Sequence, residues 1–129
     1  MKTRGGITGY FQVVTGILAL STIIKSQDIH TEKRTPTEGF LRGDVLFKDG
    51  SRLHFRELVT TEPGVQRISY TYHYQKPNGR IIFRYDDTDH FPGLSSAPHH
   101  KHIGEKDVIA VNAPDLQSVL HEIELLIKA

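Results

Sequence analysis

Histidines are concentrated in one short segment, Pro98-His99-His100-Lys101-His102. An imidazole titrates near neutral pH, so a histidine can accept or donate a proton there. A lysine can hold the charge of a phosphoryl group. One histidine could therefore take the proton of a ribose 2′-hydroxyl while another protonates the leaving oxygen. The residue types favour cleavage of a phosphodiester bond without a metal ion.

The same segment has a second interpretation, as part of a metal site. Imidazole is a good ligand for zinc, copper, nickel and iron, and His90, His100 and His102 could share a divalent ion. Adjacent histidines rarely bind one ion with good geometry, and the chain has no cysteine to supply a thiolate. We therefore expect no metal ion and no other cofactor.

Segments that precede the histidines have the alternating pattern of half-buried strands. Side chains alternate along a strand, so Leu53 and Phe55 face one way and His54 faces the other. Since guanidinium groups match the geometry of phosphate, the polar side could receive a phosphate-rich ligand. It could equally be a solvated surface with ion pairs. By alternation, the polar side carries His54, Arg56, Arg67, His73, Arg84 and Asp86.

The other side of these strands is rich in aromatic residues. It is expected to carry Ile68, Tyr70, Tyr72, Tyr74 and Tyr85. Tyrosines can stack on nucleic-acid bases. Their place on the apolar side favours packing in the hydrophobic core instead.

Five segments joined by short turns are predicted to be strands. Lys48-Asp49-Gly50 and Pro77-Asn78-Gly79 are typical hairpin turns. Strands joined by such turns lie side by side and run antiparallel, which predicts a sheet of about five strands. The expected strands are Ile23 to Lys33, Phe40 to Phe47, Ser51 to Thr60, Val65 to Gln75 and Arg80 to Asp86.

Helical patterns flank the strands at both ends of the chain. Apolar residues follow helical spacing from Thr8 to Leu20, and again after Asn112, a good N-cap, from Leu116 to Ile127. Residues 87–107 have no periodic pattern, so we expect a long functional loop there, followed by a short edge strand over Val108 to Val111. The predicted fold class is α+β, with the N- and C-terminal helices packed on one face of the antiparallel sheet.

Composition indicates an ordinary globular protein. The 129 residues fit a single domain over 1–129, with residues 1–6 frayed. Sixteen Lys and Arg against 15 Asp and Glu give a net charge of +1, which excludes nucleic-acid binding by bulk charge alone. The apolar run from Tyr10 to Ile24 is shorter than the roughly 20 residues of a membrane span. We expect a cytoplasmic protein without a membrane partner.

Five sequence segments carry a family resemblance: Glu32-Lys33-Arg34-Thr35-Pro36, Gly50-Ser51-Arg52-Leu53-His54-Phe55-Arg56-Glu57, Tyr72-His73-Tyr74-Gln75, Ile82-Phe83-Arg84-Tyr85-Asp86 and Pro98-His99-His100-Lys101-His102. Together they resemble the TumE-type toxin family of prokaryotic toxin–antitoxin systems. The resemblance runs from roughly Ile29 to the C-terminal helix. It implies the toxin of a type II pair, encoded beside an antitoxin that is a helix-turn-helix DNA-binding protein.

The residues and the resemblance together lead to one functional hypothesis and one alternative. The hypothesis is a toxin that acts on RNA as a metal-independent endoribonuclease, and hence a hydrolase. The alternative is a non-catalytic module that binds nucleic acid or a partner through the same polar face. The sequence also allows a homodimer, because the N-terminal helix can pack on its own sheet or on that of a second copy. The expected catalytic residues are His73, His99, His100, His102 and Asp86, and the expected substrate-binding residues are Arg56, Arg84, Lys101 and His54.

Overall fold

The computed structural model describes residues 5–88 and 96–128. Within these residues the chain forms two helices and seven strands. The elements in chain order are α1 (Gly6–Ala19), β1 (Ile24–Lys33), β2 (Glu38–Phe47), β3 (Arg52–Thr60), β4 (Gln66–Gln75), β5 (Ile81–Asp86), β6 (His100–Ile103), β7 (Asp107–Ala110) and α2 (Leu116–Lys128).

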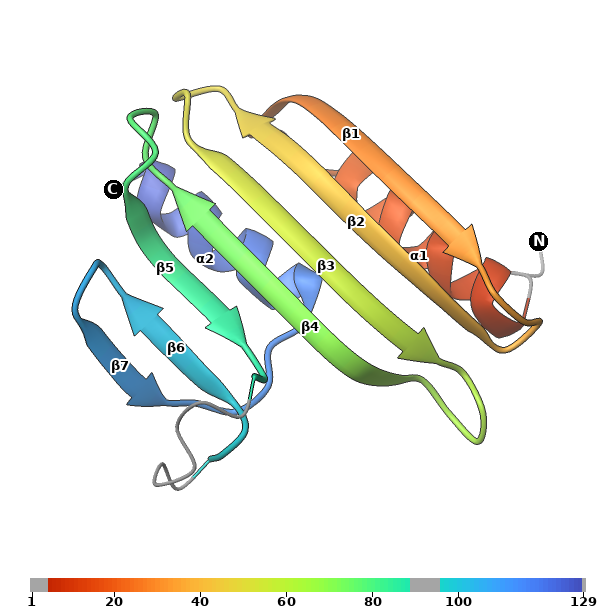
Figure 1. The fold of residues 1–129 in the computed structure, drawn as a ribbon. Coiled ribbons are helices and arrows are strands. Elements are labelled where there is room, and N and C mark those ends of the chain that lie inside the picture. Colours follow the sequence, from red (N-terminus) through yellow and green to blue (C-terminus); the bar gives the residue numbers. More distant parts are fainter. Residues whose placement is uncertain (1–4, 89–95, 129) are drawn as a thin grey trace.

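The strands form one sheet in the order in which they occur along the chain. Each strand pairs antiparallel with the next, from β1 at one edge to β7 at the other (Figure 1). The two predicted hairpin turns join β2 to β3 and β4 to β5. At each turn a glycine, Gly50 or Gly79, has a positive φ of 88° or 87°. Other residues rarely adopt this conformation, which explains why these glycines mark the turns.

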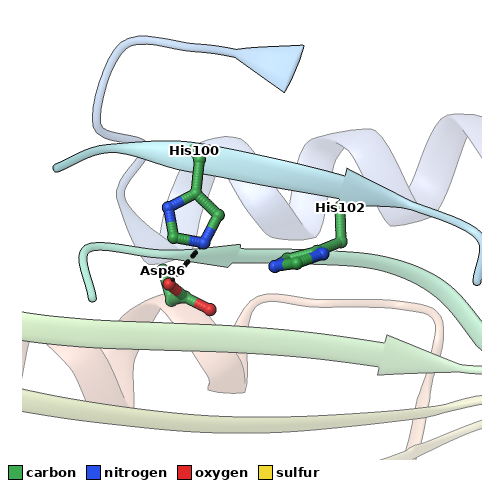
Figure 2. A group of neighbouring side chains, drawn as sticks. All are labelled: Asp86, His100 and His102. Carbon is green, nitrogen blue, oxygen red and sulfur yellow. Dashed lines mark ion pairs between the residues drawn. The ribbon is translucent and has the colours of Figure 1, made fainter. Parts of the chain in front are cut away.

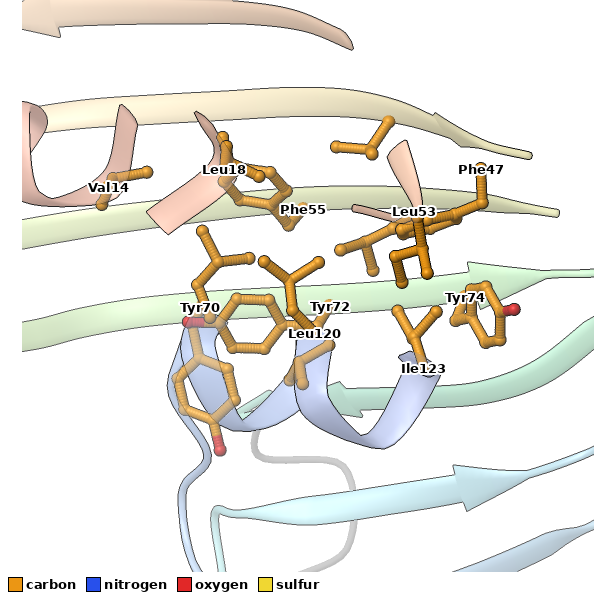
Figure 3. Close-up of a cluster of buried hydrophobic side chains, with 14 of the residues drawn as sticks. Val14, Leu18, Phe47, Leu53, Phe55, Tyr70, Tyr72, Tyr74, Leu120 and Ile123 are labelled. Atoms are coloured by element: carbon orange, nitrogen blue, oxygen red, sulfur yellow. The ribbon is translucent and has the colours of Figure 1, made fainter. Parts of the chain in front are cut away.

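Both helices lie on the same face of the sheet, as predicted. In Figure 1, α1 lies behind β1 and β2, and α2 lies behind β4 and β5. The hydrophobic core fills the space between this helical layer and the sheet (Figure 3). Tyr70, Tyr72 and Tyr74 are buried in it, which confirms that these tyrosines pack in the core. No helix of the described residues lies on the opposite side of the sheet, which we call the open face.

Alternation along the neighbouring strands β2 and β3 produces these two faces. In β3 the core side chains Leu53 and Phe55 alternate with His54 and Arg56 on the open face. Gly43 of β2 lies opposite Phe55, and a Cβ at Gly43 would come within 2.4 Å of the Phe55 ring. Glycine at this position therefore leaves the space that the Phe55 ring occupies against the β2 backbone.

The predicted strand count was too low. The sheet has seven strands rather than about five, because β6 lies inside the segment 87–107 that was expected to be a loop. Its sequence, His-Lys-His-Ile, has no apolar alternation to reveal a strand. The expected edge strand near Val108 is β7, at the end of the sheet. Of the six residues expected to fray, residues 1–4 lie outside the described part, and Gly6 already belongs to α1.

A β-bulge in β4 overturns part of the predicted face assignment. The pairing skips Ile68, so that Val59 lies opposite Arg67 and Leu58 opposite Ser69. Arg67 consequently points to the helical side rather than the polar side, and Ile68 is exposed rather than buried. One extra residue in a strand moves the side chain of every residue beyond it to the opposite face of the sheet.

The start of α2 also differs from the prediction. The helix begins at Leu116, and its cap is Asp115 rather than Asn112. The Asp115 carboxylate accepts a hydrogen bond from the Ser118 backbone N–H at 2.8 Å, as an N-cap side chain does. None of the described helices is long and apolar enough to cross a membrane.

Candidate functional site

Two neighbouring rows of polar side chains cross the open face. Members of a row lie directly opposite one another on consecutive strands, so their side chains point to the same side. The first row consists of Asp44, His54, His73, Arg84 and His102. The second row, two residues further along each strand, consists of Arg42, Arg56, Thr71, Asp86 and His100.

The second row ends in a buried ion pair between Asp86 and His100. Their side chains are 4% and 1% exposed, and Nε2 of His100 lies 2.8 Å from Oδ1 of Asp86 (Figure 2). The other ring nitrogen, Nδ1, lies 3.0 Å from the carbonyl oxygen of Pro98. Both nitrogens thus face oxygen acceptors, and an imidazole satisfies both only when each nitrogen carries a proton.

Asp86 is surrounded by hydrogen-bond donors. Thr88 donates to Oδ1 from its backbone N–H at 3.1 Å and from its hydroxyl at 2.7 Å. Arg84 donates from Nε to Oδ2 at 3.0 Å. A buried carboxylate needs such partners to keep its charge, and this set fixes the orientation of the Arg84 guanidinium.

Arg84 connects the buried pair to the first row. Its Nη2 lies 3.0 Å from Nε2 of His102, and since a guanidinium has no acceptor, Nε2 must accept this bond with its lone pair. Burial lowers the pKa of His102, and the charges of Arg84 and His100 lower it further. His102 is therefore held as the neutral ring.

His73 lies on the other side of Arg84, one strand away. Burial lowers the pKa of His73, as do the charges of Arg84 and His54. No described residue forms a hydrogen bond with its ring. A neutral, partly buried imidazole with a free ring nitrogen can act as a general base.

His54 forms a more exposed pair with Asp44. Nδ1 of His54 lies 2.7 Å from Oδ1 of Asp44, and the side chains are 40% and 67% exposed. Solvent screens such a pair, so it contributes little to stability. The structure places His54 in the first row, next to His73, as the alternation predicted.

Two of the predicted site residues lie on the opposite side of the sheet. Lys101 alternates with His100 and His102, and its Nζ donates to Glu122 of α2 at 2.6 Å and lies 4.8 Å from the centre of the Tyr85 ring. His99 stacks on Tyr70, and its Nδ1 lies 2.9 Å from the Tyr70 hydroxyl. The five-residue histidine segment therefore does not act as one cluster.

The buried pair and His102 could also bind a metal ion. One donor atom from each of Asp86, His100 and His102 lies within 4.8 Å of the others, and these donor types suit zinc. The Arg84 guanidinium, however, already contacts Asp86 and His102. A metal ion at this position would have to displace it. His90, the third ligand considered from the sequence, lies outside the described residues.

Two further charged residues, Arg42 and Glu57, belong to the site and its support but were not predicted from the sequence. Arg42 belongs to the second row, and alternation along β2 would have placed it there. Glu57 lies on the core side of β3 and accepts hydrogen bonds from the hydroxyls of Tyr10 in α1 and Tyr72 in β4. Burial and the neighbouring Glu57 charge raise the pKa of both tyrosines. Glu57 thus attaches α1 to the sheet.

The model of one toxin family matches residues 14–128, nearly the whole chain. The protein is therefore a member of a class of small α+β toxins. The family is described as Toxin TumE, and the chain belongs to it. This confirms the family identified from the sequence, and a toxin family implies an antitoxin partner. Searches of curated proteins and of solved structures gave no match.

Proposed function

We propose that this protein is the toxin of a type II pair and cleaves RNA in the cytoplasm as a metal-independent endoribonuclease. Its antitoxin would be a helix-turn-helix DNA-binding protein. The observation that supports the activity best is the alignment of three side chains across adjacent strands: His73 on β4, Arg84 on β5 and His102 on β6 lie directly opposite one another.

The spacing of these residues suits one phosphodiester. Neighbouring strands lie about 4.8 Å apart, so the backbones at His73 and His102 are separated by about 10 Å. A phosphate bound over Arg84 would meet the guanidinium with its non-bridging oxygens. One imidazole would then lie on each side of the phosphorus, which in-line displacement requires.

In this proposal His73 is the base and His102 the acid. His73 takes the proton of the ribose 2′-hydroxyl, and the 2′-oxygen attacks phosphorus to form a 2′,3′-cyclic phosphate. The bond from phosphorus to the 5′-oxygen breaks, and His102 protonates that oxygen. In the free protein His102 is the neutral ring, and it takes up the proton that it later donates when the negative charge of a phosphate bound over Arg84 favours its charged form.

Asp86 and His100 act as positioning residues. Asp86 receives Arg84 on one oxygen and His100 on the other, so the buried pair holds the guanidinium in place before substrate binds. Arg84 supplies the positive charge that stabilises the extra negative charge of the transition state. A divalent cation is therefore not required by this mechanism.

The proposal is tested by expressing the wild type and single variants, following growth, and incubating each purified protein with total RNA in EDTA. His73→Ala, Arg84→Ala and His102→Ala should each lose growth arrest and cleavage. His121→Ala, an exposed histidine of α2 on the other side of the sheet, serves as the matched control and should retain both.

Each other outcome points to a different conclusion. Cleavage that EDTA abolishes would assign Asp86, His100 and His102 to a metal ion. RNA binding without any product would favour the non-catalytic binding module. Growth arrest without binding or cleavage would contradict an RNA target altogether.

A further inference from the structure

Two arginines of the second row face each other without an ion-pair partner among the described residues. Arg42 on β2 lies directly opposite Arg56 on β3, and both are exposed on the open face. Like charges in directly opposite positions destabilise a sheet. No described residue forms an ion pair or a side-chain hydrogen bond with either guanidinium.

The acidic residues nearest the pair among the described residues form no ion pair with it: Asp28 on β1 lies diagonal to Arg42 and does not contact its guanidinium within ion-pair distance. Next in the row come His30 on β1 and Thr71 on β4, neither of which carries negative charge. Asp44, two residues from Arg42, is already paired with His54 at 2.7 Å. Neither guanidinium is thus neutralised by an ion pair with a described residue, in a chain whose net charge is only +1.

The position of the pair relates it to the proposed cleavage site. Arg56 is separated from Arg84 by two strand spacings, about 10 Å, and by one row, about 7 Å along the strand. This distance is too long for both arginines to hold the same phosphate. It suits two phosphates of one strand that crosses the sheet from β5 towards β2.

We propose that Arg42 and Arg56 form a second phosphate-binding site, which holds the backbone of a single-stranded RNA substrate away from the cleaved bond. This inference rests on the proposed function. Two planar guanidiniums can clamp phosphate oxygens in bidentate fashion. Neither row contains Phe, Tyr or Trp, and contacts between guanidinium groups and phosphate carry no base information; Phe40 lies on the same face, two residues from Arg42. Recognition here is of the backbone rather than of the base sequence.

The test measures binding separately from cleavage. A labelled single-stranded RNA with 2′-O-methyl groups cannot form the cyclic phosphate, so its affinity can be measured by fluorescence anisotropy at several salt concentrations. The variant is Arg42→Gln/Arg56→Gln. The matched control, Lys76→Gln/Arg80→Gln, removes the same charge from the exposed turn between β4 and β5.

We expect the slope of log affinity against log salt to fall by about 0.7 for each phosphate contact that the variant loses. The wild type should gain affinity when the RNA is lengthened from four to eight nucleotides, and the Arg42→Gln/Arg56→Gln variant should lose most of that gain. The control should keep the wild-type slope and the gain. Circular dichroism establishes that both double variants are folded.

Two results would overturn the inference, and they are distinguishable. If the wild type binds and the arginine variant has the same slope and length dependence as the control, the second phosphate site does not exist, and the proposed cleavage site is unaffected. If the wild type binds no RNA at any length, the second site and the proposed function fail together.

Discussion

Replacing Asp86 with Asn is the sharpest test of the buried pair on β5 and β6. The substitution keeps the shape of the side chain and removes its charge. In the wild type the carboxylate has His100 on one oxygen and Arg84 on the other, at 2.8 Å and 3.0 Å. The variant leaves two buried or half-buried basic groups without their acidic partner.

The magnitude follows from the burial of the two side chains, which are 4% and 1% exposed. Removing one member of a buried ion pair costs about 3–5 kcal/mol. The amide of Asn can still accept a hydrogen bond from Thr88, so we expect the lower end, about 3 kcal/mol. This is a large part of a typical stability of about 5–15 kcal/mol.

Urea unfolding at pH 7, followed by circular dichroism, measures this loss. With a denaturant slope of about 1.5 kcal/mol per molar, the midpoint should fall by about 2 M. Asp44→Asn is the matched control, because it breaks a carboxylate–histidine pair that is 67% and 40% exposed. Asp44→Asn should lower the free energy of unfolding by less than about 1 kcal/mol. Equal losses in the two variants would refute the structural importance assigned to the Asp86–His100 pair.

Three further predictions follow from the same structure. The pKa values of His73 and His102 lie below their ordinary value of 6.5 in the folded protein. As the pH drops below 6.5, the unfolded chain therefore binds more protons than the folded protein, and the free energy of unfolding should fall. Urea titrations of the His73→Gln/His102→Gln variant should show a weaker decline. The Arg42→Gln/Arg56→Gln variant relieves charge repulsion and should raise the free energy of unfolding by about 0.5 kcal/mol. A lower free energy of unfolding in urea titrations would contradict repulsion between the two arginines. Glu57→Gln should lower that free energy by about 2 kcal/mol, since it weakens the buried hydrogen bonds to two tyrosines; an unchanged urea midpoint would contradict this role.

The helices and the first five strands could be predicted from the sequence, as could the face of the sheet on which most of their side chains lie. Alternation in β3 depends only on the two-residue period of a strand, so it placed His54 and Arg56 correctly. The hairpin turns were evident because Gly50 and Gly79 occupy positive φ angles, 88° and 87°, that other residues avoid. These features are local, and local sequence is sufficient to specify them.

The remaining features depend on contacts between segments that are distant in the sequence. The bulge that turns Arg67 towards the helices is a property of how β4 pairs with β3. Strand β6 is stabilised by its pairing with β5 and β7 rather than by an apolar pattern of its own. Without that strand, the sequence could not show that His100 and His102 lie on one face while Lys101 lies on the other.

The most direct test of the proposed activity is the chemistry of the RNA ends. Purified protein is incubated in EDTA with a labelled single-stranded RNA, and the products are identified by mass spectrometry. We expect 2′,3′-cyclic phosphate and 5′-hydroxyl ends from the wild type, and no product from His73→Ala or His102→Ala. Intact RNA with the wild type, or cleavage that leaves 3′-hydroxyl ends and requires a divalent cation, would contradict the assignment of His73, Arg84 and His102 as the catalytic residues.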